Sequence, residues 1–362
     1  MKSPDLITVN EAFERYGDFD RVLDARSPGE FNQDHLPGAS NIPVLTDEER
    51  SRVGILYKES GGFIAKKIGA ALVSRNIANA LDGSLVDLNR NARLLVYCWR
   101  GGNRSGALAT VLARVGWHTT VLDGGYRAFR RYVLDELRIL PSRFRLIVIA
   151  GRTGSGKSLI LERLQELGAQ VLDLERLARH RGSVLGHLPD SSQPSQRHFE
   201  TLLWNALRSF DDTRPVLVES ESRKIGQFQL PSELIEKMRS SACIRIEASD
   251  QTRCELLLAE YRHFVEDPEQ LLRRLVALED HHGPNRVSEW MTKAHLGDWS
   301  GFVRDLLHQH YDPAYDRSMR RNYRQIDESN LVGLSDASDA ALQAAARRVL
   351  ELIGELVASR PQ

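Results

Sequence analysis

The fold of the second half of this chain is decided by one stretch, Gly151-Arg152-Thr153-Gly154-Ser155-Gly156-Lys157-Ser158, which fits the pattern G-x-x-x-x-G-K-[ST] at every position. A β-rich run at 146–150 precedes it and an apolar segment at 159–161 follows it, so we expect a strand, a phosphate-binding loop and a helix. The glycines let backbone N–H groups point inward, where the helix N-terminus adds partial positive charge. Lys157 can contact terminal phosphoryl oxygens and Ser158 can ligate Mg²⁺, so a di- or triphosphate is the predicted ligand.

Acidic residues end two further apolar runs and are candidates for the acid that accompanies such a loop in many phosphate-handling enzymes. The run 216–218 ends in Glu219-Ser220-Glu221, and the run 171–172 ends in Asp173. Glu219, Glu221 and Asp173 are therefore candidate acids or metal ligands. Solvated strand ends without a chemical role explain them equally well.

Short apolar runs alternate with helical spacing along most of the chain, which predicts parallel α/β sheets in both halves. In the first half we expect strands at 21–25, 93–97 and 119–122 and helices at 63–73 and 106–115. In the second half we expect strands at 144–150, 170–174, 216–219 and 243–247 and helices at 157–167, 195–210 and 252–262. The spacing from 266 to 310 is mostly helical.

The pattern breaks at Leu140-Pro141-Ser142, and we place the domain boundary there. We expect a first domain at 1–137, an α/β domain with a helical insertion at 138–335, and a C-terminal packing helix within 336–362. The length of 362 residues agrees with two domains, because a domain has roughly 150 residues.

The composition excludes several classes of protein. Hydrophobic residues make up 41% and charged residues 27%, unlike disordered, collagen-like or coiled-coil chains. The 49 basic and 49 acidic residues cancel, so only a local basic face can attract nucleic acid. Three cysteines are too few for a disulfide framework and suit a reducing compartment. With neither an apolar signal core nor a run of about 20 apolar residues, we expect a cytoplasmic protein that does not bind membranes.

A second loop that suits an anion is Cys98-Trp99-Arg100-Gly101-Gly102-Asn103-Arg104-Ser105, which also lies between a predicted strand and a predicted helix. Backbone N–H groups and a helix N-terminus favour the thiolate of Cys98. Arg100 and Arg104 add guanidinium groups that suit a tetrahedral oxyanion. Such a cysteine is a nucleophile toward sulfur, selenium or phosphorus. Cys243, in an apolar strand, and Cys254, in a helix, are predicted to be inert.

The spacing of cysteine, five residues and arginine also occurs in phosphatases, so phosphoryl-enzyme chemistry is an alternative for this loop. Sulfur-type transfer is favoured because Tyr97, and not a histidine, precedes the cysteine. The flanking segments resemble the rhodanese family over about residues 9–137. The matching segments are LDARSPGEF at 23–31, HLPGA at 35–39, NIP at 41–43 and LDGGY at 122–126. The loop is one residue longer than in many sulfur-transferring rhodaneses, which leaves room for a phosphorus-bearing donor.

With both loops in one polypeptide, the whole chain resembles the bacterial tRNA 2-selenouridine synthases. Further matching segments are HRGS at 180–183, QPSQ at 193–196, FE at 199–200, ESESRKIG at 219–226 and HYDPAY at 310–315. The family pattern at 219–223 is Glu-Asp-Glu-Ser-Arg, so Ser220 departs from it, which argues against a metal role there. The resemblance implies an N-terminal rhodanese-like parallel-sheet domain and a P-loop NTPase-like α/β domain with a helical C-terminal region.

The resemblance also implies a two-step transferase that acts on 2-thiouridine at the wobble position of tRNA. The sulfur first attacks geranyl diphosphate and releases pyrophosphate, and selenium from selenophosphate then replaces the geranylthio group. Cys98 would carry selenium as a selenosulfide while Arg100 and Arg104 hold selenophosphate. The loop of Lys157 would stabilise the charge that develops on pyrophosphate. No tightly bound cofactor is expected; Mg²⁺ through Ser158 and a selenophosphate-supplying partner enzyme are open alternatives.

Transfer RNA needs a basic surface even on a neutral protein. Candidate contacts at helical spacing, with Tyr315 and Tyr323 nearby for stacking, are Arg317, Arg320, Arg321 and Arg324. A solvated arginine face explains these residues equally well. Further candidate contacts to tRNA or substrate are His180, Arg181 and Arg223.

Two other functions stay open. An ATP-dependent sulfurtransferase or kinase fused to a rhodanese domain would hydrolyse ATP robustly. A non-catalytic RNA-binding regulator would have an unreactive Cys98 with an ordinary pKa.

Overall fold

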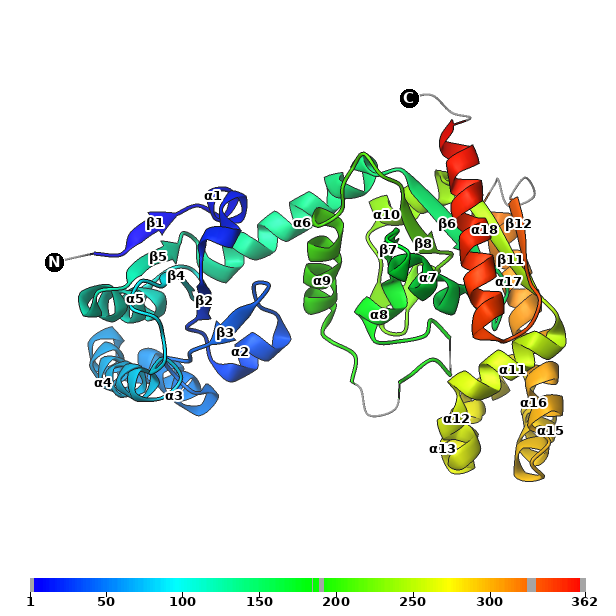
Figure 1. Cartoon of the computed structure of the whole chain (residues 1–362). Helices are drawn as coiled ribbons and strands as arrows, with labels where there is room; N and C mark the ends of the chain where they lie inside the picture. Colours follow the sequence, from blue (N-terminus) through cyan, green and yellow to red (C-terminus); the bar gives the residue numbers. More distant parts are fainter. Residues whose placement is uncertain (1–2, 184, 189–191, 324–329, 359–362) are drawn as a thin grey trace. The chain divides into compact units, whose positions relative to one another are not determined.

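The computed structural model describes residues 3–183, 185–188, 192–323 and 330–358, which form two compact units (Figure 1). Unit 1 comprises the chain up to Glu136 together with Pro194–Asn205. Unit 2 comprises Leu137–Gln193 and the chain from Ala206 onward. The sequence placed 194–205 in the second domain, whereas the structure groups this stretch with unit 1.

Unit 1 contains a five-stranded parallel sheet in the order β1-β5-β4-β2-β3. Its strands are β1 (Asp5–Ile7), β2 (Arg21–Asp24), β3 (Ala39–Asn41), β4 (Arg93–Tyr97) and β5 (His118–Leu122). The last four residues of β4 are buried, as is typical of a parallel strand that is covered on both faces. The three-residue edge strands β1 and β3 are too short for their pattern to predict them.

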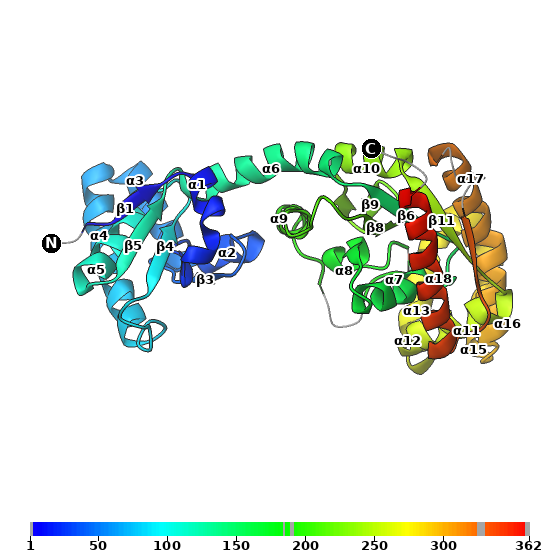
Figure 2. The ribbon, with the colours of Figure 1, turned by 45° about the horizontal axis from the view of Figure 1, so that its top comes forward.

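Helices cover both faces of this sheet (Figure 2). They are α1 (Val9–Glu14), α2 (Pro28–Gln33), α3 (Asp47–Glu59), α4 (Gly62–Asp82), α5 (Asn103–Val115) and α6 (Gly125–Arg143). Leu108 and Leu112 of α5 share a core with Leu94 and Val96 of β4. Helix α6 continues through Pro141. The predicted break at 140–142 is therefore wrong, because the proline lies in the last turn of a helix whose final residues include the buried Leu140.

Unit 2 contains a second five-stranded parallel sheet, in the order β12-β11-β6-β8-β7. Its strands are β6 (Leu146–Ala150), β7 (Gln170–Leu172), β8 (Val216–Glu219), β11 (Ala242–Ala248) and β12 (Asn330–Leu334). All five residues of β6 are buried, so the strand that leads into the phosphate-binding loop lies at the centre of the core. A short antiparallel pair, β9 (Lys224–Ile225) and β10 (Phe228–Gln229), lies outside the sheet.

The helices of unit 2 divide into those that cover the sheet and a group inserted between β11 and β12. The first set is α7 (Lys157–Glu166), α8 (Leu174–Ala178), α10 (Ser232–Ser240) and α18 (Asp339–Ala358). The chain of α9 (Gln196–Arg208) contributes mainly to unit 1. The inserted set is α11 (Asp250–Glu260), α12 (Arg262–Glu266), α13 (Pro268–Leu275), α14 (Glu279–His282), α15 (Pro284–His295), α16 (Trp299–Leu306) and α17 (Asp312–Asn322), with a π-helical turn at Leu307–Tyr311 between the last two.

The C-terminal helix α18 packs as its apolar spacing predicts. Leu342, Ala345 and Val349 are buried in the core that the helix shares with the sheet and α7. Among the helices of the described residues, none combines the length and the apolar character that a bilayer crossing requires.

Candidate active sites

The Cys98 loop connects β4 to α5 in unit 1, with Gly102 at the N-cap of the helix. Its backbone closes tightly against the turn that follows β5. Gly101 has φ +67°, and a Cβ atom there would lie 2.8 Å from the carbonyl oxygen of Leu122. Gly125 approaches the carbonyl of Cys98 so closely that it leaves no room for a side chain. These glycines allow the tight backbone conformation of the loop. Cys98, at the base of the loop, is buried and only 3% exposed.

The thiol of Cys98 faces hydrogen-bond donors of its own loop. Burial opposes its ionisation, but the pKa of Cys98 is lowered by the hydroxyl of Ser105 and by the backbone N–H groups of Ser105, Arg100 and Gly102. The hydroxyl of Ser105 donates to Sγ at 3.1 Å. Burial raises the pKa of Cys243 to about 11 and also raises that of Cys254. Of the three thiols, Cys98 is therefore the one whose surroundings favour the thiolate.

The two arginines of this loop differ in their surroundings. Arg104 makes a bidentate ion pair with Glu30 of α2, with Nη1 2.6 Å from Oε2 and Nη2 3.2 Å from Oε1. Burial raises the pKa of Glu30, but the hydrogen bonds from Arg104 outweigh this and lower it. Arg100 is exposed and has no acidic partner among the described residues. Among the residues that the structure describes, one guanidinium of the predicted pair is thus left without a counterion.

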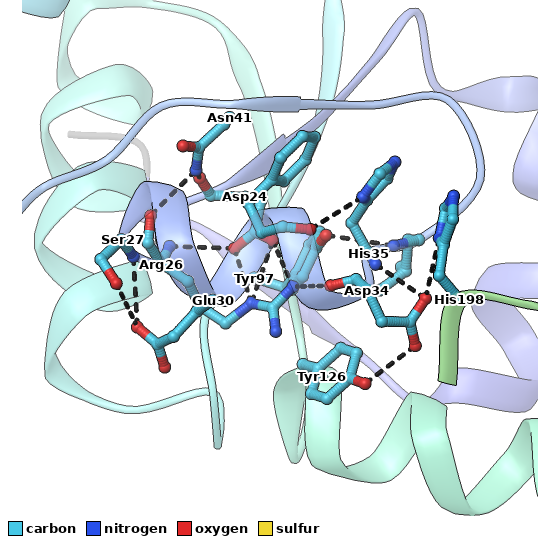
Figure 3. A network of polar contacts seen from close by, with 12 residues as sticks. Asp24, Arg26, Ser27, Glu30, Asp34, His35, Asn41, Tyr97, Tyr126 and His198 are labelled. Atoms are coloured by element: carbon cyan, nitrogen blue, oxygen red, sulfur yellow. Dashed lines mark hydrogen bonds and ion pairs between the residues drawn. The ribbon is translucent and has the colours of Figure 1, made fainter. Parts of the chain in front are cut away.

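A buried polar network lies next to the loop in unit 1 (Figure 3). Arg26 and Asp24 are 1% and 0% exposed and form an ion pair in which Nη2 lies 2.6 Å from Oδ2. The same nitrogen donates to the carbonyl of Asp34 at 2.6 Å. The guanidinium lies 4.0 Å from the ring centre of Tyr126, in a cation–π contact. Arg26 thereby joins β2, the segment after α2 and the start of α6.

Asp34 connects this network to α9. Its Oδ2 accepts a hydrogen bond from Tyr126 at 2.8 Å, and its Oδ1 lies 3.3 Å from Nδ1 of His198 (Figure 3). Oδ2 also accepts a hydrogen bond from Thr201 at 3.0 Å. Trp204, which is fully buried, packs edge-on against Phe13 with ring centres 4.9 Å apart. The segment 194–205 is therefore an integral part of unit 1.

The P-loop of unit 2 has the predicted strand, loop and helix context, with β6 before it and α7 beginning at Lys157. Gly154 and Gly156 adopt φ angles of +77° and +81°, which favour glycine. The amine of Lys157 donates to the carbonyl of Gly151 at 2.7 Å, and burial lowers its pKa despite the surrounding glutamates. The backbone N–H of Gly151 donates to the hydroxyl of Tyr315 at 2.7 Å.

Helices of the insertion hold the P-loop from outside. The guanidinium of Arg253, on α11, donates to the carbonyl of Thr153 at 2.9 Å and pairs with the buried carboxylate of Asp312 on α17. Arg152 forms a second, more exposed bridge to Asp316, with Nη2 2.7 Å from Oδ2. The loop therefore rests on α11 and α17, and its shape depends on the insertion.

Three glutamates converge beside Lys157 and Ser158. Oxygen atoms of Glu175, Glu219 and Glu221 lie within 4.8 Å of one another, and Ser158 Oγ donates to Glu175 Oε2 at 3.3 Å. Burial, followed by the charge of Glu221, raises the pKa of Glu175 to about 8. Burial raises the pKa of Glu221 to about 7, and that of Glu219 well above its ordinary value. Clustered carboxylates with a hydroxyl form an oxygen donor set that fits Mg²⁺.

Other predicted residues lie elsewhere. Asp173 caps α8 by accepting the N–H of Arg176 at 2.8 Å. His180 is 2% exposed and packs against His187, so it presents no surface to tRNA, and burial lowers its pKa to about 4. Arg181 pairs with Glu260, with Nε 2.9 Å from Oε1.

The exposed predicted arginines are Arg223, Arg317, Arg320 and Arg321, the last three on α17, whereas Arg324 lies outside the described residues. The aromatic residues expected to stack beside them are engaged internally. Tyr315 contacts the P-loop, and Tyr323 is 4% exposed. Burial therefore contradicts the expected stacking for Tyr323, whereas for Tyr315, which is partly exposed, it stays a prediction.

Several site residues were missed because nothing local marks them. Glu175 follows Asp173 by two residues, and only the fold shows that Glu175 points toward Ser158 while Asp173 caps a helix. Glu30 meets Arg104 across 74 positions of sequence. The capping box of α2 explains Glu30 without reference to Cys98.

Fold and loops together define an enzyme with a rhodanese-like unit and a P-loop unit in one chain. Residues 8–132 match the rhodanese-like domain, and residues 144–294 match the tRNA 2-selenouridine synthase AAA domain. The tRNA 2-selenouridine synthase of Sulfurovum sp. (strain NBC37-1) is 32% identical over 84% of this chain and 90% of that protein. That of Nitrosomonas europaea is 35% identical over 72% of this chain and 68% of that protein. That of Alcanivorax borkumensis is 32% identical over 83% of this chain and 90% of that protein.

The chain belongs to the tRNA 2-selenouridine synthase family. The resemblance seen in the sequence, the α/β fold class with its two kinds of domain, and the expectation of an enzyme are confirmed.

Proposed function

We propose that this protein converts wobble 2-thiouridine of tRNA into 2-selenouridine in two steps, S-geranylation by geranyl diphosphate and then replacement of the geranylthio group by selenium from selenophosphate. The observation that carries the proposal is the presence, in one chain, of a thiol with a lowered pKa in an N–H-lined loop and of a complete P-loop beside a cluster of glutamates.

The first step is assigned to unit 2. As the thiocarbonyl sulfur forms its bond to C1 of the geranyl group, the C1–O bond breaks and pyrophosphate leaves. Lys157 and the N–H groups of the P-loop are suited to stabilise the charge on that leaving group. Ser158, Glu175, Glu219 and Glu221 would hold Mg²⁺, which supplies further charge neutralisation at pyrophosphate when bound.

The second step is assigned to unit 1, where Cys98 is the thiol on which use of the selenium donor depends. Selenium of selenophosphate forms the bond to C2 of the base as the C2–S bond breaks and geranylthiol leaves, and water takes the phosphoryl group as phosphate. The lowered pKa of Cys98 increases the share of the thiolate, which is the nucleophilic form. Arg100, exposed and without an internal counterion among the described residues, suits the oxyanion of selenophosphate. Arg104 would also contact selenophosphate, while it shares its charge with Glu30.

Two substitutions separate the steps. Nucleosides are analysed by mass spectrometry after tRNA containing 2-thiouridine is incubated with geranyl diphosphate and then with selenophosphate. Cys98→Ser should accumulate S-geranyl-2-thiouridine without 2-selenouridine, whereas Lys157→Ala should form neither. Cys254→Ser serves as the control thiol and should give the complete product. Full selenation by Cys98→Ser would contradict the role of Cys98, and unchanged geranylation by Lys157→Ala would contradict that of the P-loop.

ATP-dependent sulfurtransfer or phosphoryl transfer is the second candidate, because a P-loop suits ATP as well as other diphosphates. Robust ATP hydrolysis, stimulated by tRNA and lost in Lys157→Ala, would favour it over the prenyl step.

A further inference from the structure

An apolar cavity borders the P-loop within unit 2. Its walls come from α11, α12, α13, α16 and the π-helical turn, together with Thr153 of the P-loop. Six of the lining residues are Leu257, Tyr261, Phe264, Trp299, Phe302 and Val303. The helical insertion thus does more than brace the loop, since it also encloses a hydrocarbon-lined space beside it.

The lining is incompletely packed for a purely structural core. Phe264 and Phe302 are buried, but Leu257, Leu258, Tyr261 and Trp299 are only half buried, although they pack against the same core. The polar lining is limited to a few hydroxyl-bearing side chains, among them Thr153 and Ser183. Ligand pockets commonly combine many apolar walls with a few polar groups.

The cavity and the phosphate-binding loop share a wall. Leu257 lines the cavity and also packs against Gly154, where a Cβ atom would lie 2.8 Å from the leucine Cδ1. Thr153 belongs to both features, and its carbonyl is held by Arg253. The apolar wall of the cavity therefore begins at the P-loop itself.

From this arrangement we infer that the cavity beside Thr153 receives the isoprenoid tail of the diphosphate bound by the P-loop, an inference that rests on the proposed prenyl-transfer function. A nucleoside fits this lining poorly, because the polar atoms of its base and the hydroxyls of its ribose would lose hydrogen bonds to water without gaining enough hydrogen-bond partners in the cavity. A branched hydrocarbon chain makes no hydrogen bonds to water, and the burial of its apolar surface favours binding.

Entry of the tail requires movement of the lining. The cavity measures about 60 Å³, so a ten-carbon chain must displace half-buried side chains such as Trp299. The fluorescence of Trp299 should therefore change when geranyl diphosphate binds and stay unchanged when inorganic pyrophosphate binds. Trp299→Phe identifies the contribution of this tryptophan to the signal.

The decisive experiment is calorimetric titration of the full-length protein with inorganic pyrophosphate and with geranyl diphosphate. The wild-type protein should bind geranyl diphosphate at least about tenfold more tightly than pyrophosphate, since even one methylene in an apolar pocket is worth about tenfold. Val303→Phe, which fills the cavity, should remove most of that gain while pyrophosphate binds as before. Arg304→Ala, the exposed neighbour on α16, should retain the gain.

A second variant keeps the inference testable where Val303→Phe does not fold. Phe302→Ala enlarges the cavity, so the ratio of farnesyl to geranyl diphosphate use should rise about tenfold, a ratio that is independent of the active fraction. Binding of pyrophosphate with no gain from the geranyl group, or an equal gain in Val303→Phe, would overturn the tail pocket and leave the P-loop assignment standing. Failure of the wild-type protein to bind pyrophosphate would instead overturn the proposed function and, with it, this inference.

Discussion

The hydroxyl of Tyr315 accepts the backbone N–H of Gly151 at 2.7 Å, so a side chain of α17 is bound to the first residue of the P-loop. Tyr315→Phe leaves that N–H without its partner, which costs about 1–3 kcal/mol for a buried donor. We expect a lower free energy of unfolding and several-fold weaker pyrophosphate binding, measured by denaturation and calorimetry. Tyr57→Phe, at an exposed tyrosine, is the control. Unchanged values for Tyr315→Phe would show that the contact does not support the loop.

Ser105 should control the ionisation of Cys98. Ser105→Ala removes the hydroxyl that hydrogen-bonds to the sulfur, so the pKa of Cys98 should rise and alkylation by iodoacetamide should shift to higher pH. A hydrogen bond to a charged group is worth about 1.5–3 kcal/mol, so at a pH below the pKa the reaction should become about 10- to 150-fold slower. Mass spectrometry of the Cys98 and Cys254 peptides gives both profiles in one experiment. An unaltered Cys98 profile would assign its stabilisation to the backbone N–H groups alone.

The glutamate cluster should make stability fall as pH rises. Burial and the nearby Glu221 raise the pKa of Glu175 to about 8 from an ordinary value of 4.5. Between these values the folded state binds more protons than the unfolded state, so the free energy of unfolding decreases with increasing pH. Each such group contributes at most about 1.4 kcal/mol per pH unit. Glu175→Gln should flatten this decrease between pH 5 and pH 8 in EDTA.

The measurement for this prediction is urea denaturation at several pH values, with Glu269→Gln as the exposed control. A decrease as steep in Glu175→Gln as in the wild-type protein would place the proton uptake on other groups.

The buried pair Asp24–Arg26 should be far more sensitive than an exposed pair. Asp24→Ala leaves the guanidinium of Arg26 buried without its carboxylate, which costs about 3–5 kcal/mol. Arg15→Ala breaks the exposed pair with Asp18 and should change stability by less than about 1 kcal/mol. Chemical denaturation of the two variants measures the difference. Similar values for both would mean that neighbouring groups compensate for the loss of Asp24.

The exposed arginines of α17 give a test for contact with tRNA. Replacing Arg317, Arg320 and Arg321 by alanine should reduce the slope of log affinity against log salt by about 0.7–0.9 for each phosphate group that is no longer neutralised. Filter binding of tRNA at several salt concentrations measures the slope. Arg348→Ala on α18 is the control, and an unchanged slope in the triple variant would remove this face from the interface.

The loops and strands that short, contiguous stretches of sequence determine could be predicted. The P-loop, the Cys98 loop and the buried strands β4, β6 and β8 depend on local patterns of glycine and apolar residues, and the structure places them as expected. The edge strand β3 has only three residues, all half buried, so no alternating pattern marks it. Helix α6 passes through Pro141 although this proline has no N–H to donate to the helix, so the proline misled the prediction of where the helix ends.

The partners of the site residues could not be predicted, because they depend on distant contacts. Glu175, and not Asp173, lies next to Ser158, because the carboxylate of Asp173 caps α8. The pairing of Arg104 with Glu30 and the burial of His180 likewise depend on how helices pack. Residue type and spacing gave no indication of these relationships.

The rings of Phe13 and Phe129 pack edge-on against Trp204, which follows them by at least 75 positions in the sequence. The segment that holds this tryptophan returns to unit 1 only after the chain has passed through the P-loop of unit 2. An N-terminal fragment that stops near residue 137 would lose this indole and the partners of Asp34 on α9. Its aromatic surface would meet water, so such a truncated protein should aggregate. During synthesis on the ribosome, unit 1 likewise cannot be completed until about residue 205 has emerged.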